Sequence, residues 1–277
     1  MWSRLALQAL VVTSLLPATS SAQSSSSVII KKDVIYGRVQ GSALLADVAY
    51  PEGTGRLPAI MYVHGGRWQG GTRADASAAN VAKWAESGFF TMTIDYRLVG
   101  GSPAPAPYED MLCAIRWLHT HAAEYRVDPD RIYLVGFSSG GHMVSLAATL
   151  GDGPFKRVGG WENARTDVRG VISTGGAYDL NTLSWGNLWT PVSGDVVAAR
   201  RQASPLHQIT PATKPILIVH SDDDKSVPIQ QAIDMDKALE AAKIPHRFVH
   251  YKDRGHVGAT EEVLKEVRAF IAEIEKR

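Results

Sequence analysis

The segment Arg131-Ile-Tyr-Leu-Val-Gly-Phe-Ser-Ser-Gly-Gly-His142 decides how the rest of the chain is interpreted. The apolar run Ile132–Val135 predicts a short buried strand, and residues 141–149 predict a helix. Between them lies a Gly-x-Ser-x-Gly pentapeptide, in which glycines flank the turn and remove Cβ atoms that would collide there. This context predicts Ser138 as a nucleophile whose hydroxyl points out of the sheet. The simpler alternative is a glycine- and serine-rich turn without chemistry.

The composition is that of one globular domain preceded by an export signal. The chain has 277 residues, of which 45% are hydrophobic and 21% charged. Residues 1–22 contain one basic residue, a short apolar stretch and small residues at Ser20-Ser-Ala22, and they predict a signal peptide. Residues 23–27 form a serine-rich linker, and residues 28–277 form the expected domain. We therefore expect a secreted or periplasmic protein with no stable membrane anchor.

Charge and cysteine content exclude several classes of protein. The chain has 29 basic and 28 acidic residues, and removal of residues 1–22 takes away Arg4 alone, leaving 28 of each. A near-neutral surface argues against nucleic acid as a partner. The single cysteine, Cys113, lies in an apolar helical pattern, so the exported chain forms no internal disulfide.

The order of apolar runs predicts a mostly parallel sheet with helices on both faces, an α/β fold. Two antiparallel strands are expected first, within residues 28–36 and 43–50. Later strands are expected at 57–63, 89–95, 168–175, 215–220 and 247–251, and helices at 74–86, from about 111 to 123, at 229–241 and at 260–275. Residues 103–107, Pro-Ala-Pro-Ala-Pro, predict a loop. Residues 178–205 lack clear periodicity and predict a small inserted lid.

A serine nucleophile needs an imidazole to take its proton and an acid to orient that imidazole. His256 is the candidate base, because it lies between glycines on a loop that follows the last expected strand. The acid is expected among Asp222, Asp223 and Asp224, which follow the strand that ends at His220. Asp224 is favoured because it precedes the turn into the next helix, and Asp222 is the second choice. The order Ser, Asp, His is that of α/β-hydrolases.

The glycines of His64-Gly-Gly-Arg-Trp68 follow a central buried strand and allow close approach of the backbone to a substrate. Their N–H groups, with that of Ser139, predict an oxyanion hole. A glycine-rich connecting loop is the alternative. Trp68, Trp185 and Trp189 are candidate substrate-pocket walls, with ordinary packing as the other interpretation of the two lid tryptophans. No metal and no cofactor is expected.

Taken together, these motifs resemble the α/β-hydrolase esterases related to the hormone-sensitive-lipase group. The resemblance rests on His64-Gly-Gly-x-Trp68, Asp95-Tyr-Arg97, Glu109-Asp110, Ala114-Ile-Arg-Trp-Leu118, Gly136-x-Ser-x-Gly-Gly-His142, Ser204-Pro205, Pro215-x-Leu-Ile-Val-His220-x-x-x-Asp224-x-x-Val-Pro228 and Gly255-His256. It is greatest to secreted bacterial esterases similar to acetyl-xylan and feruloyl esterases. It runs from about Val28 to the C-terminus.

The resemblance implies Ser138 as nucleophile, His256 as base, Asp224 as acid and an oxyanion hole of the N–H groups of Gly66, Arg67 and Ser139. Arg67 stands where many relatives have a third glycine, and Ser221 stands where the acid motif often has glycine. The implied function is a serine carboxylesterase acting on small-molecule or polysaccharide-linked esters. An amidase, an aryl-formamidase or a peptidase would use the same triad, and a catalytically silent binding protein is the alternative from another class. The oligomeric state is not predicted.

Overall fold

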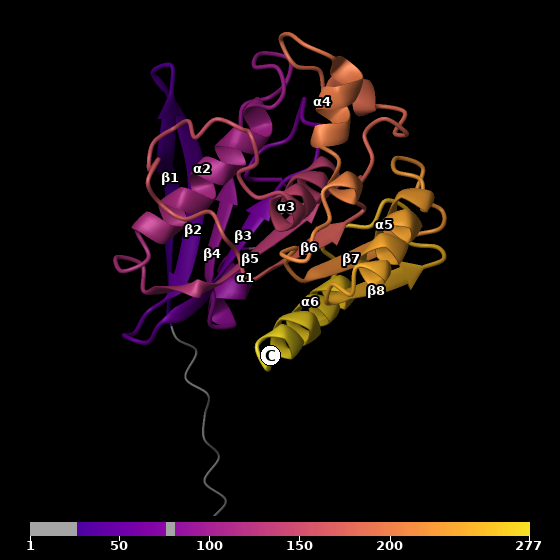
Figure 1. Ribbon diagram of the computed structural model, residues 1–277. Coiled ribbons are helices and arrows are strands. Elements are labelled where there is room, and N and C mark those ends of the chain that lie inside the picture. Colours follow the sequence, from indigo (N-terminus) through magenta and orange to yellow (C-terminus); the bar gives the residue numbers. More distant parts are fainter. Residues whose placement is uncertain (1–26, 76–80) are drawn as a thin grey trace, which may run out of the picture.

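A sheet of eight strands forms the centre of the molecule (Figure 1). The structure is a computed structural model that describes residues 27–75 and 81–277. The strands lie in the order β1-β2-β4-β3-β5-β6-β7-β8. β1 and β2 pair antiparallel, as do β2 and β4, and the other neighbours pair parallel. Their bounds are β1 Val28–Val39, β2 Ser42–Pro51, β3 Leu57–Val63, β4 Phe90–Ile94, β5 Val127–Phe137, β6 Gly170–Thr174, β7 Ile216–Ser221 and β8 His246–Tyr251. The predicted mostly parallel sheet is confirmed.

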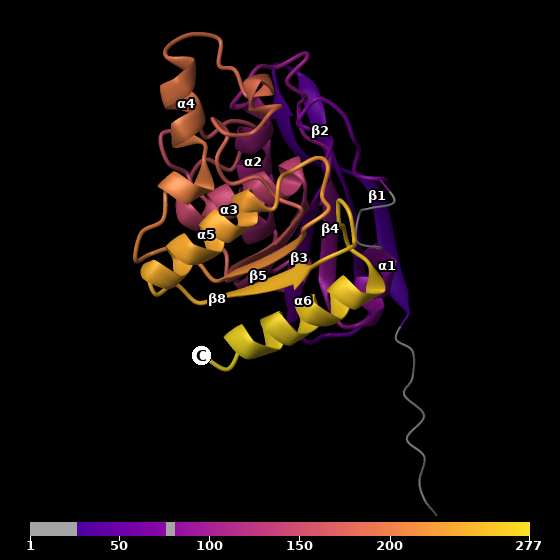
Figure 2. The same cartoon turned by 90° about the vertical axis from the view of Figure 1, so that its right-hand side faces the viewer.

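Helices cover both faces of this sheet, as the sequence predicts. α1 and α6 lie on one side and α2, α3 and α5 on the other (Figure 2). Their bounds are α1 Val81–Glu86, α2 Ala106–Thr120, α3 Ser139–Thr149, α4 Val196–Gln202, α5 Gln230–Ala241 and α6 Glu261–Ile274, with short 3-10 turns η1 Gly186–Leu188 and η2 Pro205–His207. Within the described residues, no helix combines the length and the apolar character that a membrane span requires.

Each central strand is apolar on both faces because it separates two cores. In β3, Met61 packs into the core under α2 and α3, whereas Ile60 and Tyr62 pack into the core under α6. β5 alternates in the same way, with Leu134 in the first core and Val135 in the second. A strand covered on both sides reads as a continuous apolar run. This explains why both strands are recognisable in the sequence.

Two helices begin elsewhere than the sequence predicts. The helix expected from residue 74 is replaced by a turn at Arg73 and Ala74, after which the Asp75 carboxylate accepts the Thr72 N–H. Arg73 pairs there with Asp33, Asp47 and Asp95, which holds this segment against the first strands. Residues 76–80 lie outside the described residues, and α1 begins at Val81.

α2 begins inside the proline-rich stretch that predicts a loop. Its first residues are Ala106 and Pro107. Proline is tolerated there because the first turn of a helix has no internal partner for its N–H groups. The expectation of a loop through residue 107 is therefore wrong for its last two residues.

Residues 178–205, the predicted lid, carry η1 and α4. α4 lies at the top of both views, away from α6 (Figures 1 and 2). The carboxylate of Asp195 caps α4 by accepting the N–H groups of Val197 and Ala198, and the helix has no buried residue. Its role as a lid stays a prediction. The predicted signal peptide, residues 1–22, and all but the last residue of the predicted linker lie outside the described residues.

Candidate active site

Ser138 occupies a strained turn between β5 and α3. Its backbone has φ 55° and ψ −117°, and its N–H donates to the carbonyl of Thr174 at 2.8 Å. For a residue other than glycine, such a conformation costs about 1–3 kcal/mol and persists only where the surroundings enforce it. The strand-turn-helix context that the sequence predicts for Ser138 is therefore present.

The flanking glycines are required because the turn presses against neighbouring backbone. A Cβ on Gly136 would lie 2.3 Å from the carbonyl oxygen of Gly140. A Cβ on Gly140 would lie 2.1 Å from the carbonyl oxygen of Val63, at the end of β3. Any side chain at either position would push the turn away from the sheet. The spacing of the motif is thus a packing requirement as well as a signature.

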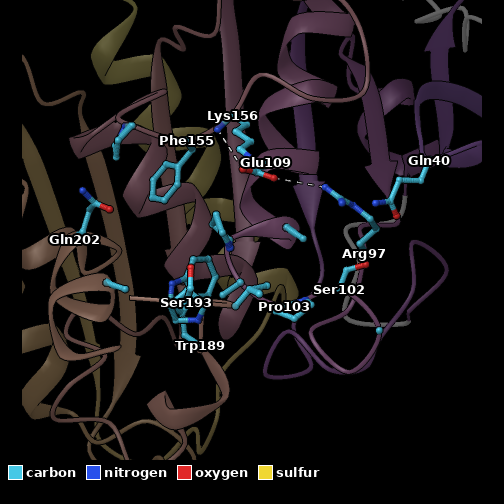
Figure 3. Close-up of a pocket in the computed structure, with 18 residues that line it drawn as sticks. Gln40, Arg97, Ser102, Pro103, Glu109, Phe155, Lys156, Trp189, Ser193 and Gln202 are labelled. Carbon is cyan, nitrogen blue, oxygen red and sulfur yellow. Dashed lines mark hydrogen bonds and ion pairs between the residues drawn. The ribbon is translucent and has the colours of Figure 1, made fainter. Parts of the chain in front are cut away.

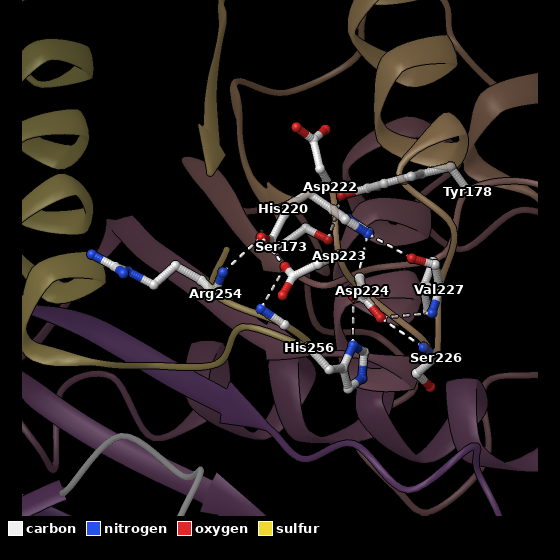
Figure 4. A network of polar contacts seen from close by, with 12 residues as sticks. Ser173, Tyr178, His220, Asp222, Asp223, Asp224, Ser226, Val227, Arg254 and His256 are labelled. Atoms are coloured by element: carbon white, nitrogen blue, oxygen red, sulfur yellow. Dashed lines mark hydrogen bonds and ion pairs between the residues drawn. The ribbon is translucent and has the colours of Figure 1, made fainter. Parts of the chain in front are cut away.

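Asp224 and His256 are in direct contact, although 32 positions separate them in the chain. The Asp224 Oδ2 lies 2.7 Å from the His256 Nδ1 (Figure 4). The other carboxylate oxygen of Asp224 accepts the N–H groups of Ser226 at 2.8 Å and Val227 at 2.9 Å. The Asp224 side chain is fully buried, and that of His256 is 25% exposed. The acid is thus fixed in orientation while the imidazole remains reachable.

Asp224 is an anion despite this burial. Burial by itself raises its pKa, but the hydrogen bonds from His220, from His256 and from the Val227 N–H hold the pKa of this carboxyl well below 3.8. Hydrogen bonds to the charged form of a carboxyl outweigh its desolvation when several converge on it. A buried carboxylate facing a histidine stabilises the protonated imidazole.

His256 also lies against Phe137, which precedes the serine turn, and against Gly175 at the end of β6. Its ring centroid is 4.7 Å from that of Phe137, the residue before Ser138. A Cβ built on Gly175 would lie 3.0 Å from the His256 Cε1 and Nδ1. Gly175 directly follows Thr174, whose carbonyl holds the Ser138 N–H. The structure therefore brings the late Gly-His loop to the serine turn.

The loop with Gly66 and Arg67, where the sequence predicts an oxyanion hole, contacts the start of α3. Gly66 and Arg67 are exposed and have φ values of 111° and 54°. The next residue, Trp68, donates its N–H to the Ser139 Oγ at 3.2 Å, which ties this loop to the first residue of α3. The N-terminus of a helix offers unpaired N–H groups and a positive dipole end. The arrangement can stabilise a negative oxygen, and the roles of Gly66, Arg67 and Ser139 stay predictions.

The three candidate pocket tryptophans form a packed cluster. The Trp68 ring lies 5.0 Å from the Trp185 ring and 5.2 Å from the Trp189 ring. Trp68 is 0%, Trp185 6% and Trp189 2% exposed. The guanidinium of Arg67 lies 5.8 Å from the Trp185 ring centroid. These contacts show that the three tryptophans pack against one another beside the loop with Gly66 and Arg67. Contact between the tryptophans and a substrate stays a prediction.

A cavity of about 590 Å³ is lined in part by Trp189 (Figure 3). Trp189 and Phe155 lie on its wall, together with the ion pair between Arg97 and Glu109. Ser138, Asp224 and His256 do not line it. The cavity and the serine turn are therefore neighbouring but separate regions. Across residues 27–75 and 81–277, no group of three or more His, Cys, Asp or Glu side chains is arranged to hold a metal ion.

From the sequence, His220 has no predicted role, Asp223 is only one of three candidate acids, and Ser221 is only the residue that replaces a motif glycine. His220 is buried, and its Nε2 lies 2.9 Å from the Val227 carbonyl oxygen and 3.3 Å from the Asp224 Oδ2. Ser221 and Asp223 bond to each other and to the histidine loop. The position of His220 four residues before Asp224 is visible in the sequence, but its contact depends on how the loop turns back.

A parallel sheet with a strained serine turn and a buried Asp-His pair at its carboxyl edge defines an α/β-hydrolase. Residues 46–239 match the family model described as BD-FAE. The chain therefore belongs to the BD-FAE family, which confirms the resemblance that its motifs predict.

Relatives and solved structures agree with this assignment. The chain is 29% identical over 204 residues to the probable carboxylic ester hydrolase LipM of Mycobacterium tuberculosis, a match that covers 69% of this chain and 47% of LipM. It spans about half the length of the curated relatives it matches. A truncated carbohydrate esterase from gut microbiota has a similar structure, with a TM-score of 0.79, 24% identity, and coverage of 92% of this chain and 99% of that one. The acetyl ester-xyloside bifunctional hydrolase of Caldicellulosiruptor lactoaceticus is also similar in structure. Its TM-score is 0.71 at 21% identity, and the match covers 93% of this chain and 97% of that one.

Proposed function

We propose that this chain is a serine carboxylesterase that hydrolyses short-chain or aryl carboxylic esters through Ser138, His256 and Asp224. The observation that carries the proposal is the 2.7 Å contact between the Asp224 Oδ2 and the His256 Nδ1, beside the turn that bears Ser138. The names of the relatives, which are ester hydrolases, support the reaction class.

In the proposed reaction the Ser138 Oγ attacks the ester carbonyl carbon while its proton passes to the His256 Nε2. The carbonyl oxygen becomes negative and receives hydrogen bonds from the N–H groups of Ser139 and of Gly66 or Arg67. The tetrahedral intermediate then expels the alcohol, which takes the proton from Nε2. Water then attacks the acyl-enzyme through the same steps and releases the carboxylic acid. Asp224 stabilises the charged imidazole in both halves.

For the substrate we propose acetyl or feruloyl groups carried by plant polysaccharides. Two structural neighbours support this proposal by name, the carbohydrate esterase and the acetyl ester-xyloside hydrolase. For the location we propose export, which rests on the signal-peptide pattern of residues 1–22. Cell fractionation and N-terminal sequencing test it, because a chain found only in the cytoplasm with residues 1–22 retained would contradict export.

Turnover of an ester panel tests the reaction and its substrate class together. p-Nitrophenyl esters of increasing acyl length, acetylated xylan and methyl ferulate are compared with a p-nitroanilide of the same acyl group. We expect the esters to be cleaved and the Ser138→Ala variant to lose about three or more orders of magnitude in kcat/KM. Faster cleavage of the anilide would favour an amidase. Retained esterase activity in a folded Ser138→Ala variant would remove the assignment.

A further inference from the structure

The loops that carry Asp224 and His256 follow the neighbouring strands β7 and β8, whose last residues lie opposite each other. β7 and β8 pair parallel, with Ser221 opposite Tyr251 at their ends. The Asp222 N–H still donates to the Tyr251 carbonyl at 2.9 Å, one residue beyond the end of β7. After that point the two chains separate, and regular strand pairing no longer holds the histidine loop.

A different set of hydrogen bonds joins the loops beyond the strands. The Ser221 hydroxyl donates to the Asp223 Oδ1 at 2.6 Å and accepts the Arg254 N–H at 2.9 Å. The same Asp223 oxygen accepts the Gly255 N–H at 2.8 Å. We call these three bonds the Ser221–Asp223 clasp. Figure 4 shows Asp224 facing His256 and Asp223 facing the chain at Arg254.

Burial of Ser221 and the charge of Asp223 both strengthen the Ser221–Asp223 clasp. Ser221 is fully buried, so its hydroxyl depends on these two partners within the described residues. The hydrogen bonds from Ser221 and from the Gly255 N–H lower the pKa of Asp223 below its usual 3.8, so the acceptor is charged at neutral pH. Hydrogen bonds to a charged acceptor are roughly twice as strong as neutral ones. Two consecutive N–H groups directly before His256 are thereby fixed.

We propose that the Ser221–Asp223 clasp positions His256 for catalysis, an inference that rests on the proposed function of that residue. Asp224 contacts one ring nitrogen and therefore constrains the rotation of the imidazole. The clasp controls the position of the backbone from which the ring projects. Ser221 and Asp223 are thus positioning residues, and they touch neither the substrate nor the reacting atoms.

Kinetics of four variants test the positioning role. Asp223→Ala removes the shared acceptor, and Ser221→Ala removes the hydroxyl that holds Arg254. A misplaced catalytic group costs up to about 100-fold, so we expect kcat to fall about 10- to 100-fold in each variant while KM stays within about twofold. Asp223→Asn keeps an oxygen that can accept both bonds, more weakly without the charge, and should recover most of the kcat that Asp223→Ala loses. The matched control is Asp222→Ala, since this neighbouring carboxylate contacts His250 and not the histidine loop.

A kcat for Asp223→Ala within twofold of that for Asp222→Ala would overturn the proposal. Equal losses in Asp223→Asn and Asp223→Ala would also contradict it, because the negative charge and not the hydrogen bonds would then matter.

Amide hydrogen exchange in the unmodified protein tests the same bonds without using activity. We expect the Arg254 and Gly255 amide protons to be protected in the wild type. Exchange at Arg254 should accelerate in Ser221→Ala, exchange at Gly255 should accelerate in Asp223→Ala, and both should be unchanged in Asp222→Ala. Unprotected amides in the wild type would overturn the clasp itself, even if the variants failed to fold. A wild-type chain with protected amides but no esterase activity would instead remove the proposed function.

Discussion

Three consecutive aspartates after β7 have three different partners. Asp222 contacts His250 on the surface, Asp223 holds the backbone of the histidine loop, and Asp224 contacts His256. The sequence predicts where the acid lies but leaves Asp222 and Asp224 as alternatives. Which carboxylate points inward depends on the turn after Asp224, where its Oδ1 accepts two backbone N–H groups. That turn is a property of the folded loop and not of the residue types.

Alanine at each of these positions separates the roles. We expect Asp224→Ala to lower kcat/KM for p-nitrophenyl acetate by about 10³- to 10⁴-fold, because the imidazole loses its buried counter-ion. Asp222→Ala should stay within about twofold of the wild type, since its carboxylate is exposed and pairs with an exposed histidine. Steady-state kinetics on the folded variants measures both values. A larger loss in Asp222→Ala would move the acid to that residue.

At the scale of single elements, α3 links the serine turn to the inserted segment. His142 lies in its first turn and is fully buried between the Trp68 and Trp189 rings. Its Nε2 donates to the Ala203 carbonyl at 2.7 Å, just beyond α4. Its Nδ1 is buried without a hydrogen-bond partner in the described part of the chain. The neutral ring, with its proton on Nε2, is therefore satisfied, whereas a second proton on Nδ1 would be buried without an acceptor.

This histidine makes stability depend on pH. Burial lowers the pKa of His142 from 6.5 to about 4, against a smaller opposing effect of its bond to Ala203. Between these two values the unfolded chain binds a proton that the folded chain does not, so acid favours unfolding. One such proton changes the free energy of unfolding by at most about 1.4 kcal/mol per pH unit.

The His142→Gln variant keeps a donor for the Ala203 carbonyl and cannot titrate. We expect its free energy of unfolding to fall less steeply than that of the wild type as the pH drops from 6.5 to 4. Chemical denaturation at several pH values measures the slope. His250→Gln, which replaces an exposed histidine, serves as the comparison variant. Identical slopes for His142→Gln and the wild type would contradict this, because His142 would then bind its proton equally in the folded and the unfolded chain.

Elements with a regular apolar pattern, either a strand covered on both faces or a helix with one buried face, are the ones that the sequence predicts well. The bounds of β3 agree with the predicted 57–63, and α6 begins one residue after Thr260, which caps it through its hydroxyl. Prediction fails where polar contacts with distant residues decide the local structure. The turn at Ala74 is an example, because three aspartates far away in sequence fix the neighbouring Arg73. Such contacts leave no local periodicity.

At the scale of the whole molecule, the strand order explains why distant residues meet. β3, β5, β6, β7 and β8 are consecutive neighbours that run parallel, so the loops after them emerge at one edge. The loop with Gly66, the turn with Ser138, the acid loop and the histidine loop all lie there. The order Ser, Asp, His in the sequence was sufficient to predict this convergence. The 590 Å³ cavity beside Trp189 was not predictable, because segments from four parts of the chain line it.

We infer that the Asp224–His256 pair makes Ser138 nucleophilic, and covalent labelling of the serine measures this reactivity. The native protein is treated with a fluorophosphonate, and the modified peptide is identified by mass spectrometry. We expect one adduct, on Ser138, which is lost in Ser138→Ala and forms far more slowly in His256→Ala. An unlabelled Ser138 in the folded wild type, or labelling that proceeds at the same rate without His256, would contradict it.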